Sequence, residues 1–172
     1  MSLRIVVQTT VLTCFAALAL PALAQTDTKA ILVKHLTISR DFTLKVADQM
    51  PDKDYEFKLT PPQMSFAEQM VHLAEEQAGL LAPLSSDRPN PGKPASMSKK
   101  DVMAYVRQSF DSSIDKVSKL TPAQLSKTYS GGEGSMTGLE LVMFLLDHTT
   151  HHRASAEMYL RAKGITPTEY EY

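Results

Sequence analysis

Hydrophobic residues repeat at helical spacing in four long segments of the chain. Positions three and four apart lie on one side of an α-helix, so this pattern indicates amphipathic helices. No stretch alternates apolar and polar residues long enough to predict a half-buried strand. The sequence therefore predicts an all-α four-helix bundle, with helices over residues 28–50, 65–81, 99–120 and 139–163.

The predicted helices have recognisable ends. A capping box places a hydroxyl residue at the N-cap and a Glu or Gln three residues later, so that each satisfies a free backbone N–H. Pro and Gly after an apolar repeat end a helix. The capping boxes are Ser65 with Glu68, Thr121 with Gln124 and Thr137 with Glu140; Ser98 with Asp101 is a weaker cap, and Pro51, Pro83 and Gly164 mark ends.

The connections between these helices are long for an up-and-down bundle, in which loops are usually short. Residues 51–64, 82–97 and 121–136 each have enough length to cross the bundle. Long connections of this kind can cover one end of a bundle and carry function, although they can equally be inert.

The first 24 residues differ in composition from the rest of the chain. Arg4 is their only charged residue, residues 11–20 form an apolar run, and Ala22-Leu23-Ala24 supplies the small residues that signal peptidase recognises. The run is too short to span a bilayer. We predict that residues 1–24 are a cleaved secretory signal peptide and that residues 25–172 form one periplasmic or secreted domain. An uncleaved N-terminal anchor is the alternative.

Cleavage would remove Cys14, the only cysteine, so the mature domain would have neither a disulfide nor a catalytic thiol. The chain has 172 residues, of which 43% are hydrophobic, and a net charge of −1. This near-neutral composition suits one globular domain and lacks the basic excess of a nucleic-acid binder. We expect no nucleic-acid partner and no stable membrane span after signal cleavage.

The last predicted helix carries two histidines one turn apart, His148 and His152. They lie on the same side as an apolar stripe, and two imidazoles directed into a core are costly without polar partners. At this spacing both can bind one divalent ion. The alternative is a pair of core histidines that hydrogen-bond to other polar groups.

His72 is the natural third ligand, because it lies about 100° round the second helix from the apolar Leu73 and can reach a neighbouring helix. Alone, it would be an ordinary boundary residue. Three histidines leave coordination positions open, as in catalytic metal sites. Further candidates are His35 as a spare ligand, and Asp147, Glu75 and Glu76 as acceptors for imidazole N–H groups, the alternative for these three being surface helix charges. His151 points about 100° away from His152, so we expect it to be exposed or at the boundary of the buried face.

Other metal-binding bundles fit less well. No histidine has a glutamate three residues before it, as ferritin-like di-iron sites require, and no Cys-x-x-Cys-His sequence for c-type haem is present. A hemerythrin-like site fits better. Parts of its ligand set resemble His72 with Glu76 and His148 with His152, and His35 could add another ligand. The third predicted helix contains no histidine, so only a partial di-iron centre is available.

Two stretches of the chain resemble the DinB/YfiT-like superfamily of metal-binding four-helix bundles. Residues 50–73, MPDKDYEFKLTPPQMSFAEQMVHL, are similar to the family's first connection and second helix. Residues 136–167, MTGLELVMFLLDHTTHHRASAEMYLRAKGITP, are similar to its last helix with its His-x-x-x-His-Arg core. The resemblance covers essentially all of residues 25–172. One departure is Ala154-Ser155, where family members often have Gly-Gln.

The resemblance implies a divalent-metal triad of His72, His148 and His152. Characterised relatives include metal-dependent thiol transferases and a thiol-dependent isomerase, whereas many members have no assigned reaction. We therefore expect an exported protein that binds zinc, nickel or iron and acts as a metal-dependent hydrolase or thiol transferase on an unknown small molecule. Arg153 would bind an anionic group of the substrate and Tyr159 would line the cavity; otherwise they are a surface cation and a core aromatic.

Two other functions remain open at this point. One is a non-enzymatic bundle that binds metal or senses dioxygen, as hemerythrin-like proteins do. The other is a degenerate bundle used for interaction only, such as a homodimer formed through an exposed helix face.

Overall fold

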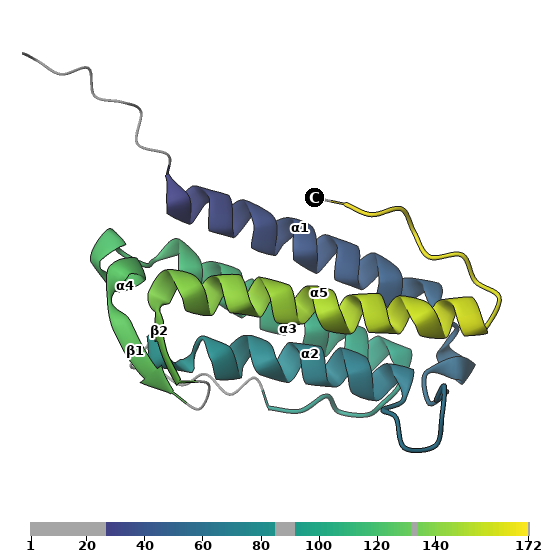
Figure 1. The fold of residues 1–172 in the computed structure, drawn as a ribbon. Helices are drawn as coiled ribbons and strands as arrows, with labels where there is room; N and C mark the ends of the chain where they lie inside the picture. The colour runs from purple at the N-terminus through teal and green to yellow at the C-terminus, as the bar shows by residue number, and fades with distance from the viewer. Residues whose placement is uncertain (1–26, 85–91, 132–133, 172) are drawn as a thin grey trace, which may run out of the picture.

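Four long helices form the protein, as the sequence predicts (Figure 1). The structure is a computed structural model that describes residues 27–84, 92–131 and 134–171. The predicted signal peptide, residues 1–24, lies outside the described residues. Each helix agrees with its predicted range to within two residues: α1 (Thr28–Gln49), α2 (Phe66–Leu80), α3 (Lys99–Ser118) and α5 (Gly138–Ala162). The all-α four-helix bundle is confirmed.

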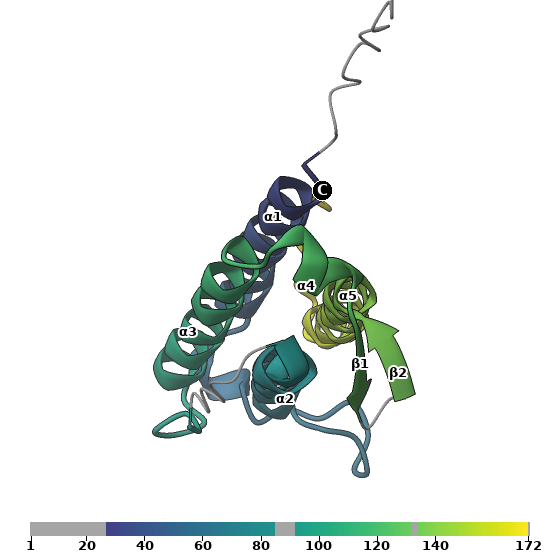
Figure 2. The ribbon, with the colours of Figure 1, turned by 90° about the vertical axis from the view of Figure 1, so that its left-hand side faces the viewer.

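Each long helix has two neighbours in the bundle. Seen nearly end-on, α5 lies between α1 and α2, and α3 completes the square (Figure 2). Close contacts join α1 and α2 each to both α3 and α5. As a result, one side of α5 packs against α2 and another side packs against α1. Both sides of α5 carry polar residues.

The predicted caps form and fix where the helices start. The hydroxyl of Ser65 accepts from the Glu68 N–H while the Glu68 carboxylate accepts from the Ser65 N–H, which closes the capping box of α2. The same reciprocal pair starts α5 at Thr137 and Glu140. Asp27 is a cap that was not predicted: its carboxylate accepts from the N–H of Ala30 and caps α1.

The expectation that the chain has no strand is wrong for one connection. Between α3 and α5 lie a short helix, α4 (Pro122–Ser126), and an antiparallel hairpin of β1 (Thr128–Gly131) and β2 (Gly134–Thr137). Strands of four residues are too short to show the alternation that sequence analysis relies on. The other two long connections contain the short 3₁₀ turns η1 (Asp52–Asp54) and η2 (Ala82–Leu84).

Glycine is required where this hairpin leads into α5. A Cβ on Gly138 would lie 2.4 Å from the carbonyl oxygen of Gln124 and 3.1 Å from the Cα of Leu125. The absence of a side chain therefore lets α4 pack directly on the first turn of α5.

The buried side chains form two apolar clusters with a polar layer between them. One cluster centres on Phe66, Phe110 and Tyr159, and the other, at the α4 end, on Leu36, Leu81 and Leu145. Between the clusters along the helices, each helix buries polar residues. They are Ser39, Gln77, Ser113, Thr149 and Arg153, each less than 8% exposed. Buried polar groups require hydrogen-bond partners, so the side chains of this layer must bond to one another or to the backbone.

Within the described residues, no helix combines the length and the apolar character needed to cross a lipid bilayer.

Candidate metal centre

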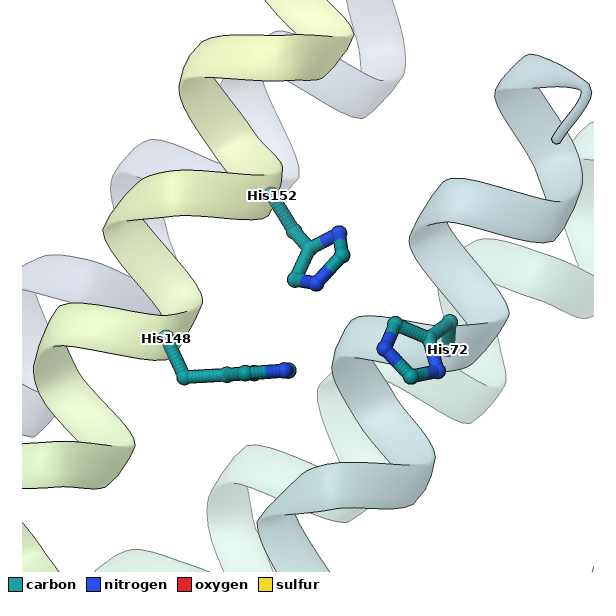
Figure 3. Close-up of side chains that lie close together, drawn as sticks. All are labelled: His72, His148 and His152. Carbon is teal, nitrogen blue, oxygen red and sulfur yellow. The ribbon is translucent and has the colours of Figure 1, made fainter. Parts of the chain in front are cut away.

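Three histidine rings from two neighbouring helices meet beside the polar layer. His148 and His152 project from successive turns of α5 toward α2, which contributes His72 (Figure 3). The ring centroids of His72 and His152 are 4.5 Å apart, those of His148 and His152 are 4.5 Å apart, and those of His72 and His148 are 5.4 Å apart. The sequence prediction that His72 joins the pair on α5 therefore agrees with the geometry.

The three rings can offer nitrogen atoms to one point. One nitrogen from each ring lies within 4.8 Å of the other two, and all three residues are partly buried. In the described ranges this is the one group of at least three histidine, cysteine, aspartate or glutamate side chains that comes together in this way. Three imidazoles at this separation can hold a metal ion.

Burial keeps two of the rings neutral. Removal from water lowers the pKa of His148, while nearby Glu76 opposes this shift and His72 adds to it. The same removal from water, followed by repulsion from His148, lowers the pKa of His152 to about 4. At neutral pH both rings are therefore uncharged, which is the form that donates a lone pair to a cation.

Gln69 is a site residue that the sequence analysis missed. Its side-chain Oε1 lies 2.7 Å from Nδ1 of His152, and both residues are partly buried. The available signal was spacing: Gln69 is three residues before His72, so both side chains leave the same side of α2. By contrast, Nδ1 of His148 is buried and has no hydrogen-bond partner in the described parts of the chain.

The donor set fits a divalent first-row metal ion. Neutral imidazole is a common ligand of zinc, nickel and iron, and three such ligands leave coordination positions open. In the part of the chain that the structure describes, no ion pair involves His72, His148 or His152. Among the described residues no carboxylate is therefore ion-paired with the rings, and the three imidazoles fit a three-histidine metal site.

The other candidate ligands lie elsewhere. His35 is exposed on α1 and does not join the three-histidine group. His151 is exposed, as predicted, with its ring edge against His152. Of the predicted acceptors for imidazole N–H groups, Glu75 and Asp147 are exposed, and the acceptor that the structure gives His152 is the amide of Gln69 instead.

Arg153 projects from α5 toward α1. It is 4% exposed, so the alternative expectation of a surface cation is wrong. Its guanidinium donates to the hydroxyl of Ser39 at 3.0 Å and to that of Thr150 at 3.3 Å, and it stacks over the ring of Phe42 at 4.4 Å from the centroid. A role in substrate binding stays a prediction for this residue.

Tyr159 is a core aromatic with one polar contact. It is 1% exposed, and its hydroxyl donates to the backbone carbonyl of Met64 at 2.6 Å. Met64 belongs to the connection before α2, so Tyr159 holds that connection against α5. Its predicted part in substrate binding likewise stays a prediction.

A surface depression of about 380 Å³ opens beside His72. Its lining is mixed, with apolar side chains next to charged ones: Lys58, Pro62, Gln63, Met64, Glu68, Val71, His72, Glu75 and Met97. A larger depression of about 730 Å³ lies at the α4 end, next to Leu120 and Leu125, and contains no histidine. The smaller one is the relevant one for chemistry because it reaches a candidate metal ligand.

The sequence pattern that defines the DinB family matches residues 25–172 of the chain. The chain belongs to the DinB family. This confirms the resemblance that the two histidine-bearing stretches indicated. No curated protein matches this DinB-family chain in sequence.

Solved structures support the fold assignment. A DinB-like protein from Bacillus subtilis, YjoA, superposes with a TM-score of 0.70 at 18% identity, covering 81% of this chain and 96% of that one. A DinB-like protein from Bacillus cereus superposes with a TM-score of 0.69 at 17% identity, covering 81% and 95%. At these identities the two structures show that the DinB-family fold is shared.

Proposed function

We propose that this DinB-family protein is an exported metalloenzyme that binds one divalent ion, zinc, nickel or iron, through His72, His148 and His152. The reaction is a hydrolysis or a thiol transfer on a small molecule. The observation that carries the proposal is the convergence of three imidazoles, one nitrogen from each within 4.8 Å of the others.

A divalent ion held by these three histidines would act as a Lewis acid and lower the pKa of a bound water or thiol. The chain contributes the conditions for this chemistry. Two of the rings are held neutral by burial, and His152 is anchored through its second nitrogen by Gln69. Three protein ligands rather than four are what an ion with an open coordination position requires.

The depression beside His72 is the proposed entrance for the substrate. Met64, Val71 and Met97 offer apolar contact in it, and the exposed carboxylate of Glu75 offers a polar one. Its volume of about 380 Å³ suits a small molecule rather than a polymer. At the same depression, Lys58 and Glu68 form an exposed ion pair with 3.2 Å between the charged atoms.

Export rests on the composition of residues 1–24 and is a separate part of the proposal. It predicts that the protein recovered from the periplasm or the medium begins at Gln25. N-terminal sequencing of that material tests it, and recovery of the uncleaved chain in the membrane fraction would support the anchor interpretation.

Elemental analysis of the mature protein, purified without an affinity tag, tests the metal site. We expect about one zinc, nickel or iron ion per chain, and almost none in a His72→Ala variant with unchanged helix content by circular dichroism. Equal metal content in the two proteins would refute the site. Assays of the metal-loaded protein with ester, amide and thiol-acceptor substrates then separate an enzyme from a non-enzymatic metal binder.

An optical spectrum after anaerobic loading with iron tests the hemerythrin-like alternative. A single ion held by three histidines gives no oxo-bridged di-iron absorption. His35 lies outside the three-histidine group, so we expect no such band.

A further inference from the structure

Gln69 constrains the protonation of His152. A side-chain amide oxygen can only accept a hydrogen bond, so the 2.7 Å contact between Oε1 of Gln69 and Nδ1 of His152 requires the proton to be on Nδ1. The neutral ring has one proton, and Nε2 is then left with the lone pair. In a free imidazole side chain the opposite tautomer, with the proton on Nε2, is the more stable one.

The orientation of the His152 ring means that a proton on Nδ1 leaves the other nitrogen free to bind a metal ion. In Figure 3 one nitrogen of His152 faces the space between His72 and His148, and the other points away from it. A proton on the inward nitrogen would block a metal ion there. A proton on the outward nitrogen leaves the inward lone pair available.

We propose that Gln69 is a positioning residue of the metal centre, which holds His152 in the Nδ1–H tautomer so that Nε2 is ready to bind the ion. This inference rests on the proposed metal site. It assigns a function to a residue of α2 that contacts no metal ion itself. Partners of this kind fix the tautomer and orientation of metal-binding histidines.

The neighbouring ligand shows what happens without such a partner. Nδ1 of His148 is buried and has no hydrogen-bond partner among the described residues. Among the described residues, no protein group therefore holds a proton on Nδ1 of His148 as Gln69 does for His152. Within the same site, His152 is preorganised and His148 is not.

An amide differs from the carboxylate that often holds a metal-binding histidine. Gln69 is uncharged, so it orients His152 without adding negative charge near the ion. A bound ion would then keep more of its positive charge, which would suit activation of water or a thiol. The substitution Gln69→Glu would keep the hydrogen bond and make the imidazole a stronger base.

The tautomer can be read directly in the metal-free protein at neutral pH. Two-bond ¹H–¹⁵N correlation spectra distinguish a protonated from an unprotonated ring nitrogen. We expect Nδ1–H for His152 in the natural protein and in Gln69→Glu, and loss of that single tautomer in Gln69→Met.

Gln77→Met is the matched control for the change at Gln69. Gln77 also lies on α2 and also bonds across to α5, but its side-chain amide donates to the hydroxyl of Thr149 at 2.9 Å and not to a histidine ring. The same substitution therefore removes one hydrogen bond between the same two helices, and Gln and Met have similar helix propensities. We expect His152 to keep its Nδ1–H tautomer in this variant.

Metal affinity, measured by competition with a chelator, gives the second readout. Gln69→Met is expected to weaken binding by about 10- to 100-fold, whereas Gln77→Met leaves it unchanged and Gln69→Glu binds at least as tightly as the natural protein. Circular dichroism checks that all variants keep their helices.

Either of two results overturns the inference: a proton on Nε2 of His152 in the natural protein, or a Gln69→Met variant with the natural tautomer and affinity. A natural protein that binds no ion at all is a different failure. That result refutes the proposed function, while the spectra of the metal-free protein still decide whether Gln69 selects the tautomer.

Discussion

His152 and Arg153 are adjacent on α5, yet their side chains enter two different environments. His152 faces α2, where three rings meet and Gln69 is its hydrogen-bond partner. Arg153 faces α1, where its guanidinium donates to Ser39 and stacks on Phe42. The C-terminal segment adds to the second environment, because Tyr170 packs edge-on against Phe42 with ring centroids 5.6 Å apart.

The two environments contain different kinds of polar groups: those facing α1 complete the fold, whereas those facing α2 are suited to bind a ligand. On the α1 side, hydroxyl acceptors and an aromatic face surround the buried cation, so its desolvation is compensated inside the protein. On the α2 side, neutral rings bring their nitrogens together, and within the described residues no carboxylate is bonded to them. A cation is the partner that converging imidazole lone pairs suit.

Loss of a ring on the α2 side should have the largest effect on ligand-linked stability. An ion that binds only the folded state raises the free energy of unfolding by about 2.7 kcal/mol at a hundred times its Kd. We expect added zinc or nickel to raise the Tm of the natural protein by several degrees and to have no effect on His148→Ala. Thermal unfolding with and without metal is the measurement.

The matched control for that experiment is His151→Ala. His151 is exposed next to His152 and does not belong to the converging group. Its variant should keep the full shift in Tm. Equal shifts in all three proteins would mean that the metal binds elsewhere.

Replacement of the buried cation on the α1 side should lower stability without affecting metal binding. Arg153→Ala removes packing against Phe42 and the bond to Ser39, and we expect the free energy of unfolding to fall by about 2–3 kcal/mol. Arg153→Met fills more of the space and removes a charge that is costly to bury, so its loss should be smaller. Urea unfolding and metal content of both variants test this. A loss of metal would contradict the view that Arg153 serves the fold and not the metal site.

The α2 side was largely predictable from sequence, whereas the α1 side was not. His148 and His152 are spaced by one helical turn on an apolar stripe, and local periodicity is the strongest signal in a single sequence. The capping residues Ser65 and Thr137 fixed the starts of the two helices that carry the triad. Helix bounds and the candidate ligand set therefore followed from local patterns.

The features that sequence analysis missed depend on contacts between distant segments. The burial of Arg153 requires Ser39 and Phe42, which lie on the first helix of the chain. The bond between Gln69 and His152 joins residues 83 positions apart. The hairpin after α4 was missed for a different reason, because its strands are too short to carry a periodic signal.

Acid should lower the free energy of unfolding of the metal-free protein, because the histidines that face α2 take up protons. The folded-state pKa of His152 is about 4, below its ordinary value of 6.5, and burial also lowers the pKa of His148. Between these values the unfolded chain binds more protons than the folded one, so the free energy of unfolding falls as the pH decreases through this window and is unaffected above it. Partial exposure of the rings keeps the effect modest.

Urea unfolding of the chelator-treated protein over this pH range measures the effect. His152→Gln cannot take up the proton and should show a shallower dependence on pH. If the stability of His152→Gln depends on pH as steeply as that of the natural protein, the acid sensitivity comes from groups other than the histidines that face α2.

The smallest effect is expected at Tyr159, about two turns beyond His152 on the same helix. Its hydroxyl donates to the carbonyl of Met64, a residue that lines the depression beside His72. Tyr159→Phe removes this one hydrogen bond and should lower the free energy of unfolding by about 1 kcal/mol, because the exposed Met64 can bond to water instead. Urea unfolding gives the stability change.

Metal content and kinetics decide what the bond between Tyr159 and Met64 does for the site. The metal content of Tyr159→Phe should stay at that of the natural protein, since the bond holds a connection and not a ligand. If a substrate is found, a higher KM with an unchanged kcat would show that this anchor shapes the entrance. A lost metal ion would instead show that the connection before α2 supports the triad itself.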